Sequence, residues 1–587
     1  MHLAALGAWK RRHSGAAVAG AGEDHGLTEV GVALAAIVVG LFGGAAAYVF
    51  RLLIGVVHNL LFLGRLSFAY DANQHTPASP WGLAVVLVPM VGALAVVFLV
   101  ENYAPEARGH GVPEVMEAIH EEGGRIRLVV AGVKALASAI SIGSGGSVGR
   151  EGPIAQIGAA LASTLGRWLR ASPSQLGTLV AAGGGAGIAA TFNTPIGGVP
   201  FAVEVLIQEL SARTLIPLAL ATGTATYVGR ALLGDAPAFP APELRTPVAA
   251  QMGYLPAYLA LGVLTGLTSL VFIRGLYATE DVFERRFPGS AYLRHVAGML
   301  LVGLSITILF RRTGHYWVEG VGYATVLDVL NGALASIPFL LALCGLKLAA
   351  TWITLGSGAS GGIFSPSMFL GATLGGAFGH VLHALSPGLT IAPAAFALAG
   401  MAGVVAGATG AAITALVMIF EMTRDYSVVL PMTLTVALSY AVRRALCRDS
   451  IYTLKLSRRG IHIPDALYAG VQLNRAVGSL ALLPVRVRTS RAGEQRGEEP
   501  GMAWVKVDDH GRPVQVHRPD GVGALLGPGE FEVVPTDMRL GDLVERLSHS
   551  GASAAVVVEQ GAGGVVGVLD AAAVLREVAR DVRRLES

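Results

Sequence analysis

The sequence predicts an all-α membrane protein with many crossings, followed by a small soluble α/β region. Hydrophobic residues make up 53% of the 587 residues and charged residues only 14%, and the mean hydropathy is +0.59. These values lie outside the range of soluble domains. After about residue 460 the composition changes, and Arg, Glu, Asp and His become common.

The membrane-spanning helices are predicted from apolar runs, because about 20 apolar residues are enough to cross a bilayer. Basic residues precede the first run (Lys10, Arg11 and Arg12) and follow the last one (Arg443 and Arg444). This placement predicts cytoplasmic termini, an even number of crossings, and residues 1–28 as a cytoplasmic leader rather than a cleaved signal, in a multi-pass protein of the cytoplasmic membrane. The runs are 31–50, 81–100, 253–273, 296–310, 336–355 and 426–442.

Several function classes are disfavoured by the residues present. The only cysteines are Cys344 and Cys447, which rules out a disulfide framework and a multi-cysteine metal site. The glycine-rich stretches contain no GxxxxGK and stand in no βαβ context. We therefore expect a protein that is not an enzyme, with no cofactor, no resident metal and no nucleic-acid partner.

An internal repeat runs through the apolar part of the chain. The segment 133–153, VKALASAISIGSGGSVGREGP, aligns without a gap with 346–366, LKLAATWITLGSGASGGIFSP. A second match places 181–205 over 398–422, so that Glu204 falls on Glu421. Repeated halves are common in transporters, where interrupted helices at the interface form the substrate site.

Three glycine-rich stretches in these halves have the form of anion sites. They are GHGVPE (109–114), GREGP (149–153) and GGIFSP (361–366), each with a proline where a helix would begin. A helix N-terminus presents free N–H groups and a partial positive charge, and glycine lets the backbone approach a bound anion closely. Tight helix packing is the alternative explanation for any one stretch.

Arg150 and Glu151 are harder to explain by packing. A charged side chain at membrane depth costs about 3 kcal/mol even on a lenient scale. A carboxylate beside an anion site can occupy that site and leave when it is protonated or displaced. Glu151 is therefore predicted to be a gate or a proton carrier.

On these residues the sequence resembles the CLC family of chloride channels and chloride/proton exchangers. GREGP is unaltered, GIFSP fits the family's GxFxP, GHGVPE stands where the family has GSGIPE, and SIYTLKLSRRG carries the tyrosine that follows the last membrane helix. The resemblance covers about residues 29–460, with halves at about 29–235 and 250–447. It implies a homodimer of inverted-repeat subunits, each with its own pathway for chloride, nitrate or other small anions.

The resemblance also assigns roles to individual residues. It implies that Glu151 is the gating glutamate, that the Tyr452 hydroxyl donates to the central anion from the inner side, and that Lys134 contributes positive potential. Without the motif, Tyr452 would be an interfacial anchor. The residues expected to bind chloride are His110, Gly111, Gly149, Arg150, Gly152, Gly362, Ile363, Phe364 and Tyr452.

Two departures from the family pattern bear on function. His110 replaces a serine whose hydroxyl faces the anion; either the ring donates to the anion, or it turns to the cytoplasm and only Gly111 and Val112 backbone contributes. Val205 stands where exchangers usually have the inner proton glutamate, just after Glu204. Valine carries no proton, which favours a channel or weakly coupled chloride transport. The alternative is a coupled chloride/proton antiporter.

The tail, residues 461–587, resembles a CBS-containing domain. One CBS-like motif is predicted at about 533–580 as helix, strand, turn, strand and helix, and 465–530 shows at best a degenerate first motif. Nucleotide-binding CBS motifs have Ser or Thr and then Asp after the second strand, whereas this chain has Asp570 and Ala573. Nucleotide binding at the tail is therefore not expected.

A remote alternative is an intramembrane serine protease. GASG (358–361) with His380 and His383 downstream resembles the rhomboid nucleophile motif. The repeat argues against this reading, because Ser360 lies opposite Ser147 in the matching half and one catalytic serine needs no symmetric twin.

Overall fold

The structure is a computed structural model that divides into two compact units, Met1–Ile463 and Pro464–Ser587. Each unit is described by itself. The described residues are 26–236, 239, 253–386, 392–424, 428–461, 463, 477–480, 482–489, 502–517, 525–538, 540–550, 552–559, 564–572 and 574. Residues 1–25 of the predicted leader lie outside them.

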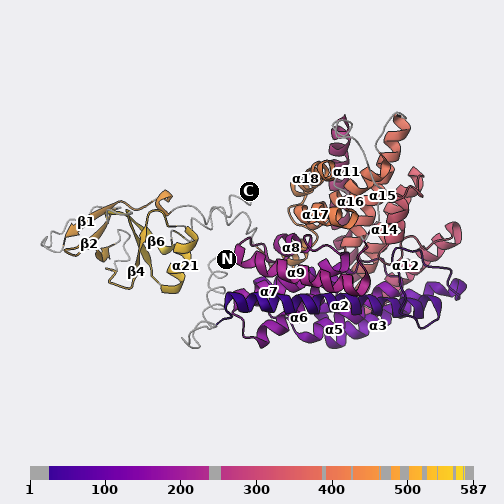
Figure 1. Cartoon of the computed structure of the whole chain (residues 1–587), viewed down its shortest axis with the longest axis horizontal. Coiled ribbons are helices and arrows are strands. Elements are labelled where there is room, and N and C mark those ends of the chain that lie inside the picture. The colour runs from indigo at the N-terminus through magenta and orange to yellow at the C-terminus, as the bar shows by residue number, and fades with distance from the viewer. Residues whose placement is uncertain are drawn as a thin grey trace. The chain divides into compact units, whose positions relative to one another are not determined.

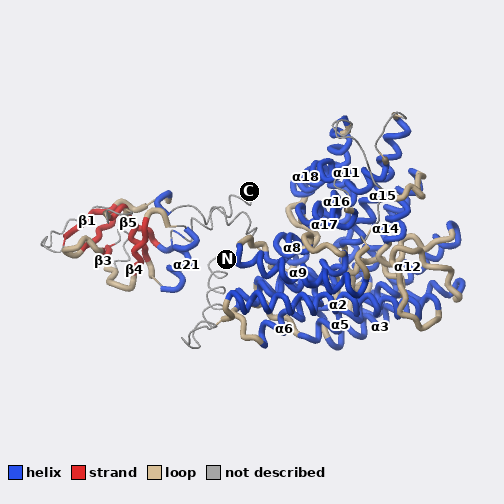
Figure 2. The backbone as a smooth tube through the Cα atoms, viewed as in Figure 1, coloured by secondary structure: helices blue, strands red, loops and turns tan. Residues whose placement is uncertain are grey.

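The first unit is helical throughout its described part (Figures 1 and 2). Short, buried loops precede the starts of α4, α6, α13 and α15. The first half contains α2 (Glu29–Leu63), η1 (Gly82–Leu87), α3 (Val88–Tyr103), η2 (Pro105–Ala107), α4 (Val112–His120), α5 (Leu128–Gly143), α6 (Glu151–Trp168), α7 (Pro173–Phe192), α8 (Gly198–Phe201), η3 (Ala202–Ile207) and α9 (Ala212–Leu233).

The second half repeats this arrangement with its own helices, which form a separate group in Figure 1. Its elements are α11 (Leu255–Arg286), α12 (Ala291–Thr313), α13 (Tyr323–Leu330), α14 (Ile337–Ser357), α15 (Phe364–Leu385), α16 (Pro393–Thr409), α17 (Ala412–Thr423), α18 (Val429–Leu446) and the short α19 (Thr453–Arg458).

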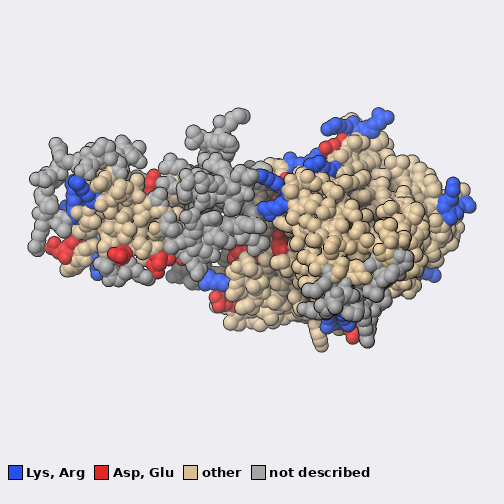
Figure 3. Space-filling model, turned by 90° about the horizontal axis from the view of Figure 1, so that it is seen from above, with Lys and Arg blue, Asp and Glu red and all other residues tan. Residues whose placement is uncertain are grey.

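Six of the described helices are long and apolar enough to cross a membrane. Five of the six predicted runs lie in such helices. The run 426–442 falls mostly in α18, which is not among the six, and α15 is the sixth instead. On the face shown in Figure 3, uncharged residues cover a wide area of this unit, and the charged side chains lie toward its margins.

Glycines at the same repeat positions let the inner helices touch through their backbones. A Cβ atom on Gly158 of α6 would collide with the Gly183 carbonyl oxygen of α7, and a Cβ on Gly183 would collide with that of Gly158. In the second half, Gly371 of α15 and Gly400 of α16 have the same reciprocal relation. Glycine therefore permits close helix packing at these two crossings.

The first prediction concerns these crossings. We expect Gly158→Ala to destabilise the purified protein by about 1–3 kcal/mol, because the added methyl group overpacks a backbone contact. Gly223→Ala is the matched control, since a Cβ at that helical position meets nothing within 4 Å. Thermal unfolding in detergent measures both variants. Equal melting temperatures for the two would contradict the packing argument.

The second unit contains two three-stranded sheets with the same pairing pattern. In each sheet the first strand pairs parallel with the second, and the second pairs antiparallel with the third. The elements are β1 (Val485–Thr489), β2 (Ala503–Val507), β3 (Pro513–His517), β4 (Phe531–Pro535), α21 (Leu540–Ser550), β5 (Ala554–Val558) and β6 (Val565–Asp570).

This α/β unit fits the CBS-like fold predicted for the tail. Helix α21 and strands β5 and β6 follow in the predicted order, while most of the predicted closing helix lies outside the described residues. The region before it, predicted to be degenerate, repeats the strand pairing of the second motif. Asp570 accepts a hydrogen bond from the Ala572 N–H at 3.2 Å, and Ala573 is outside the described residues.

Candidate functional site

The three predicted glycine-rich stretches meet inside the first unit. Gly149 donates to the Gly362 carbonyl oxygen at 2.7 Å, and Gly362 donates back to the Gly149 carbonyl oxygen at 2.6 Å. Gly109 donates to Ala359 at 3.0 Å and accepts from Gly361 at 3.2 Å. Short backbone bridges therefore hold the starts of α4, α6 and α15 together.

The Gly149–Gly362 bridge joins residues at equivalent repeat positions. Two equivalent residues that exchange both hydrogen bonds in antiparallel fashion are related by a local two-fold axis. The interface of the two halves thus passes through this bridge, and the helices α6 and α15 begin on either side of it.

Glu151 is fully buried at the first position of α6, and its carboxylate lies at the start of α15. One carboxylate oxygen, Oε2, accepts the Ser365 backbone N–H at 3.3 Å. The other, Oε1, accepts the Tyr323 hydroxyl at 2.5 Å and also the Ser365 hydroxyl. A helix N-terminus favours negative charge, so this carboxylate occupies a place suited to an anion.

The backbone donors predicted in these stretches fall into two groups. The N–H groups of Gly149 and Gly362 both donate to carbonyl oxygens of the bridge, so in this structure they are engaged with each other's backbone. The N–H groups of Ile363 and Phe364 lie at the start of α15. Backbone N–H groups at a helix start have no acceptor within the helix.

Gly152 and Arg150 make further contacts at the start of α6. A Cβ on Gly152 would collide with the His110 carbonyl oxygen, so glycine permits the close approach of α6 to the loop before α4. The Arg150 guanidinium lies 5.2 Å from the centre of the Tyr323 ring, and its buried Nε has no hydrogen-bond partner.

His110, in the loop before α4, and Tyr452, just before α19, lie together. Both are buried, and their rings are 6.1 Å apart at 61°. Nδ1 of His110 is buried without a hydrogen-bond partner, and the residue lines a cavity of about 410 Å³. The same cavity is lined by charges of both signs, which are Arg108, Lys455, Arg458 and Arg459 with Glu101, Glu280 and Glu284.

Ion pairs fix the segment that carries Tyr452. Lys455 of α19 lies 2.7 Å from the Glu114 carboxylate on α4, and Arg459 lies 3.2 Å from the same carboxylate. Arg458 pairs with Asp281 of α11. Because α19 is only one to two turns long, these contacts rather than helix propensity hold it in place.

Lys134 is fully buried and supports the loop that begins with Gly109. Its ammonium donates to the carbonyl oxygens of Ala107 at 2.9 Å and Gly109 at 2.7 Å. The repeat partner Lys347 does the same for Val318 at 3.1 Å and Gly320 at 2.8 Å. Each lysine brings a positive charge close to the site while it satisfies carbonyls that no helix satisfies.

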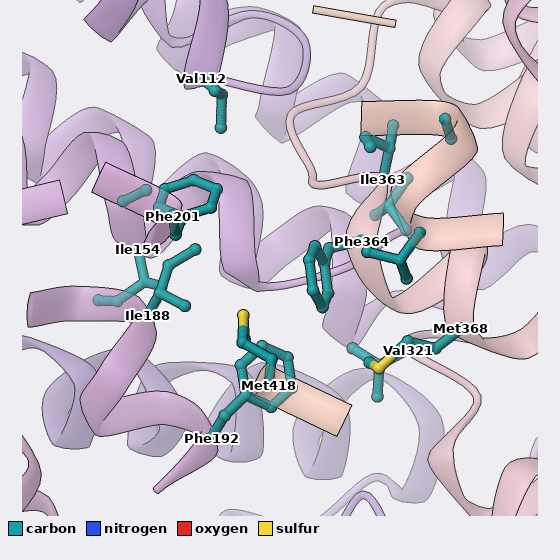
Figure 4. Close-up of a cluster of buried hydrophobic side chains, with 14 of the residues drawn as sticks. Val112, Ile154, Ile188, Phe192, Phe201, Val321, Ile363, Phe364, Met368 and Met418 are labelled. Atoms are coloured by element: carbon teal, nitrogen blue, oxygen red, sulfur yellow. The ribbon is translucent and has the colours of Figure 1, made fainter. Parts of the chain in front are cut away.

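An apolar cluster fills the region between the helix starts (Figure 4). Phe192 and Phe364 lie 5.7 Å apart in this cluster, and Ile363, Ile154 and Met418 contribute from the other elements. The site is therefore shielded from water, and charge inside it is stabilised by the fixed donors described above.

Val205 is buried in η3, a π-helical turn. The carboxylate of its neighbour Glu204 is hydrogen-bonded to another helix. Glu204 accepts the N–H groups of Ile413 at 3.0 Å and Thr414 at 2.7 Å at the start of α17. Glu421 accepts those of Ile196 at 3.1 Å and Gly197 at 2.6 Å in the first half. Each carboxylate of this pair therefore caps a helix start in the opposite half.

The second prediction follows from this reciprocal capping. We expect Glu204→Ala to lower the stability of the protein by about 1–2 kcal/mol, because two N–H groups at a helix start lose their acceptor. Glu421→Ala should have a similar effect, and Glu209→Ala, near it in sequence but exposed, should have none. Thermal unfolding measures the loss. A changed proton flux with unchanged stability would instead make Glu204 a proton carrier.

The protease alternative finds no support in this geometry. The Ser360 hydroxyl is fully buried, lies 2.9 Å from the Ser138 hydroxyl and donates to the Ala107 carbonyl oxygen at 2.7 Å. His380 lies 16 residues along α15 from Phe364, which is about 24 Å at 1.5 Å per residue. Ser360 therefore has a structural role beside Gly109.

Buried helix starts that converge on a fixed carboxylate define a polytopic membrane transport protein with interrupted helices. The family model described as "Voltage gated chloride channel" matches residues 92–444, more than half of the chain. The chain belongs to this family, the CLC chloride channels and transporters, whose members move chloride and other anions across membranes and are not enzymes.

Individual relatives agree with this family. The chain is 34% identical over 388 residues to a ClcB-like chloride channel protein of Ralstonia nicotianae, covering 65% of this chain and 87% of the relative. It is 32% identical over 445 residues to the H⁺/Cl⁻ exchange transporter ClcA of Vibrio parahaemolyticus, covering 74% of this chain and 91% of the relative.

Solved structures show the same fold. A slow cyanobacterial Cl⁻/H⁺ antiporter is similar with a TM-score of 0.64 and 26% identity, covering 73% of this chain and 97% of that one. A eukaryotic CLC transporter is similar in fold with a TM-score of 0.58 and 17% identity, covering 92% of this chain and 97% of that one.

Two residues of the site were missed by the sequence analysis. Tyr323 lies in no predicted motif, and Ser365 was noted only as part of GGIFSP. The signal for Tyr323 lies in the repeat: Lys347 supports the loop before α13 as Lys134 supports the loop before α4, so GVGYAT (320–325) matches GHGVPE (109–114).

Proposed function

We propose that the protein conducts chloride passively, or with weak proton coupling, through a pathway in each subunit that Glu151 gates. The observation that carries this proposal is the Glu151 carboxylate at the start of α15, on donors that also suit an anion. The central anion is bound by N–H groups of Ile363 and Phe364, with Gly111, His110 and Tyr452 on the inner side and Lys134 and Arg150 supplying positive potential.

Weak proton coupling is supported by the surroundings of Val205, where exchangers usually have the inner proton glutamate. Val205 is buried and apolar, and the Glu204 carboxylate beside it is committed to the start of α17. A carboxylate that holds two N–H groups of another helix cannot leave without uncapping that helix. Neither Val205 nor Glu204 can therefore exchange a proton with Glu151. Movement of Glu151 then gates the anion without proton transfer through this position.

The assembly and topology of the proposal follow the family. The protein is a homodimer in the cytoplasmic membrane, with both termini on the cytoplasmic side and a CBS-like tail that binds no nucleotide. Chloride is the proposed substrate, with nitrate and other small anions as further candidates.

The third prediction tests passive against coupled transport. In liposomes or planar bilayers with opposed chloride and pH gradients, we expect the reversal potential to follow the chloride gradient alone. Glu151→Ala should keep anion flux and lose the dependence of that flux on external pH. A reversal potential that shifts with the pH gradient, or proton uptake driven by chloride, would contradict passive conduction.

The second candidate function is a coupled chloride/proton antiporter. Relatives with 32% and 26% identity are named as an exchange transporter and an antiporter. In this case a group other than Val205 would carry the proton. His120 is the candidate, because its Nε2 lies 3.0 Å from the carbonyl oxygen of Leu206, next to Val205. Loss of proton flux in His120→Gln would support this function.

The fourth prediction concerns His110. Its buried Nδ1 has no partner beside the cavity and is proposed to donate to the anion. We expect His110→Ser to change the chloride/nitrate permeability ratio about fivefold, which corresponds to a change of about 1 kcal/mol in the preference between the two anions when a ring N–H donor is replaced by a hydroxyl donor. His295→Gln is the control, since that buried ring already bonds to the Ser357 hydroxyl at 2.9 Å. An unchanged ratio in His110→Ser would leave only backbone donors at this place.

A further inference from the structure

Two side-chain hydroxyls hold the carboxylate of Glu151 in the anion position. The Tyr323 hydroxyl donates to Oε1 at 2.5 Å, and the Ser365 hydroxyl donates to the same oxygen. We propose that Tyr323 and Ser365 are positioning residues that latch the Glu151 carboxylate in place of an anion and thereby set the chloride affinity of the pathway. This inference rests on the proposed gating role of Glu151.

The Tyr323 side chain is held in place by the packing around its ring. The Tyr323 ring is fully enclosed, with Phe239 at 5.0 Å, Phe192 at 6.4 Å and the Arg150 guanidinium at 5.2 Å from its centre. Tyr323 begins α13 directly after Gly322, whose φ of 79° suits glycine. These contacts involve the ring and the backbone of Tyr323. Its hydroxyl can therefore donate to the carboxylate.

The loop before Tyr323 is held by the buried ammonium group of Lys347. The Lys347 ammonium binds the carbonyl oxygens of Val318 and Gly320, at 3.1 and 2.8 Å. The position of the hydroxyl is therefore set by the second half of the repeat, while Glu151 itself belongs to the first half. The latch thus spans the interface of the halves.

The geometry suits a carboxylate better than a spherical anion. Both hydroxyls bind Oε1, whereas the Ser365 N–H binds Oε2 at 3.3 Å, so the donors grip two separate oxygens. A single halide cannot occupy both oxygen positions at once. Gly149 makes room for this arrangement, because a Cβ there would collide with Oε2 and lie 2.7 Å from the Ser365 hydroxyl oxygen.

The consequence is a competition between carboxylate and chloride. Hydrogen bonds to an ionised group are stronger than those between neutral groups. Each hydroxyl therefore stabilises the closed arrangement, in which the anion is excluded. Removal of either hydroxyl shifts the competition toward chloride, and it has this effect only while Glu151 is present to compete.

The fifth prediction tests the latch by the binding of chloride to the purified, detergent-solubilised full chain. Isothermal titration calorimetry with sodium chloride should show about tenfold tighter binding in Tyr323→Phe and in Ser365→Ala, which corresponds to one charge-assisted hydrogen bond each. The controls are Ser367→Ala, whose buried hydroxyl donates to the Ile363 carbonyl oxygen at 2.8 Å, and Tyr316→Phe, whose hydroxyl accepts the Ser79 N–H at 3.3 Å. Neither control should change the affinity.

A second background separates the latch from direct anion binding. In Glu151→Ala, chloride binding should be tighter than in the wild type, and adding Tyr323→Phe should change it no further. Unchanged affinity in both single hydroxyl variants would overturn the latch, as would weaker binding when Tyr323→Phe is added to Glu151→Ala. If Glu151→Ala itself leaves chloride binding unchanged, the proposed gate fails, whatever the hydroxyl variants show.

Discussion

The reciprocal hydrogen bonds between Gly149 and Gly362 are the constraint on which the site depends. They pin equivalent residues of the two halves together at 2.7 and 2.6 Å. Because α6 and α15 begin within two residues of this bridge, their N-termini are forced into one small region. The partial positive charges of two helices then add at one place, which neither half could achieve alone.

Interrupted helices leave backbone groups without hydrogen bonds, which is costly in a membrane. In this chain, buried side chains supply the missing hydrogen bonds. Loops at membrane depth leave carbonyl oxygens without helical donors, and lipid offers none. Lys134 and Lys347 satisfy two carbonyls each, and Glu204 and Glu421 satisfy exposed N–H groups of the opposite half. The buried charges therefore stabilise the interruptions that create the site.

The sequence was sufficient to predict the fold class, the repeat and the neighbourhood of Glu151. Glycine-rich stretches before helix starts have a strong local signature, and their physical chemistry points to an anion. The sequence did not predict which of these N–H groups would be hydrogen-bonded to the backbone, because the Gly149–Gly362 bridge joins residues that are 213 positions apart. Tyr323 was missed for the same reason, because its role exists only through a contact with Glu151, 172 positions away.

The functional character of the site lies in the differences between the two halves. GREGP and GIFSP begin equivalent helices, but only the first carries a carboxylate; GHGVPE and GVGYAT occupy equivalent loops, but only the second carries a phenol. Two-fold symmetry brings these unlike residues face to face, so the acid of one half meets the hydroxyl of the other. A strictly symmetric repeat would hold an anion equally from both sides. The asymmetric residues instead place a carboxylate on one side and its hydroxyl partner on the other.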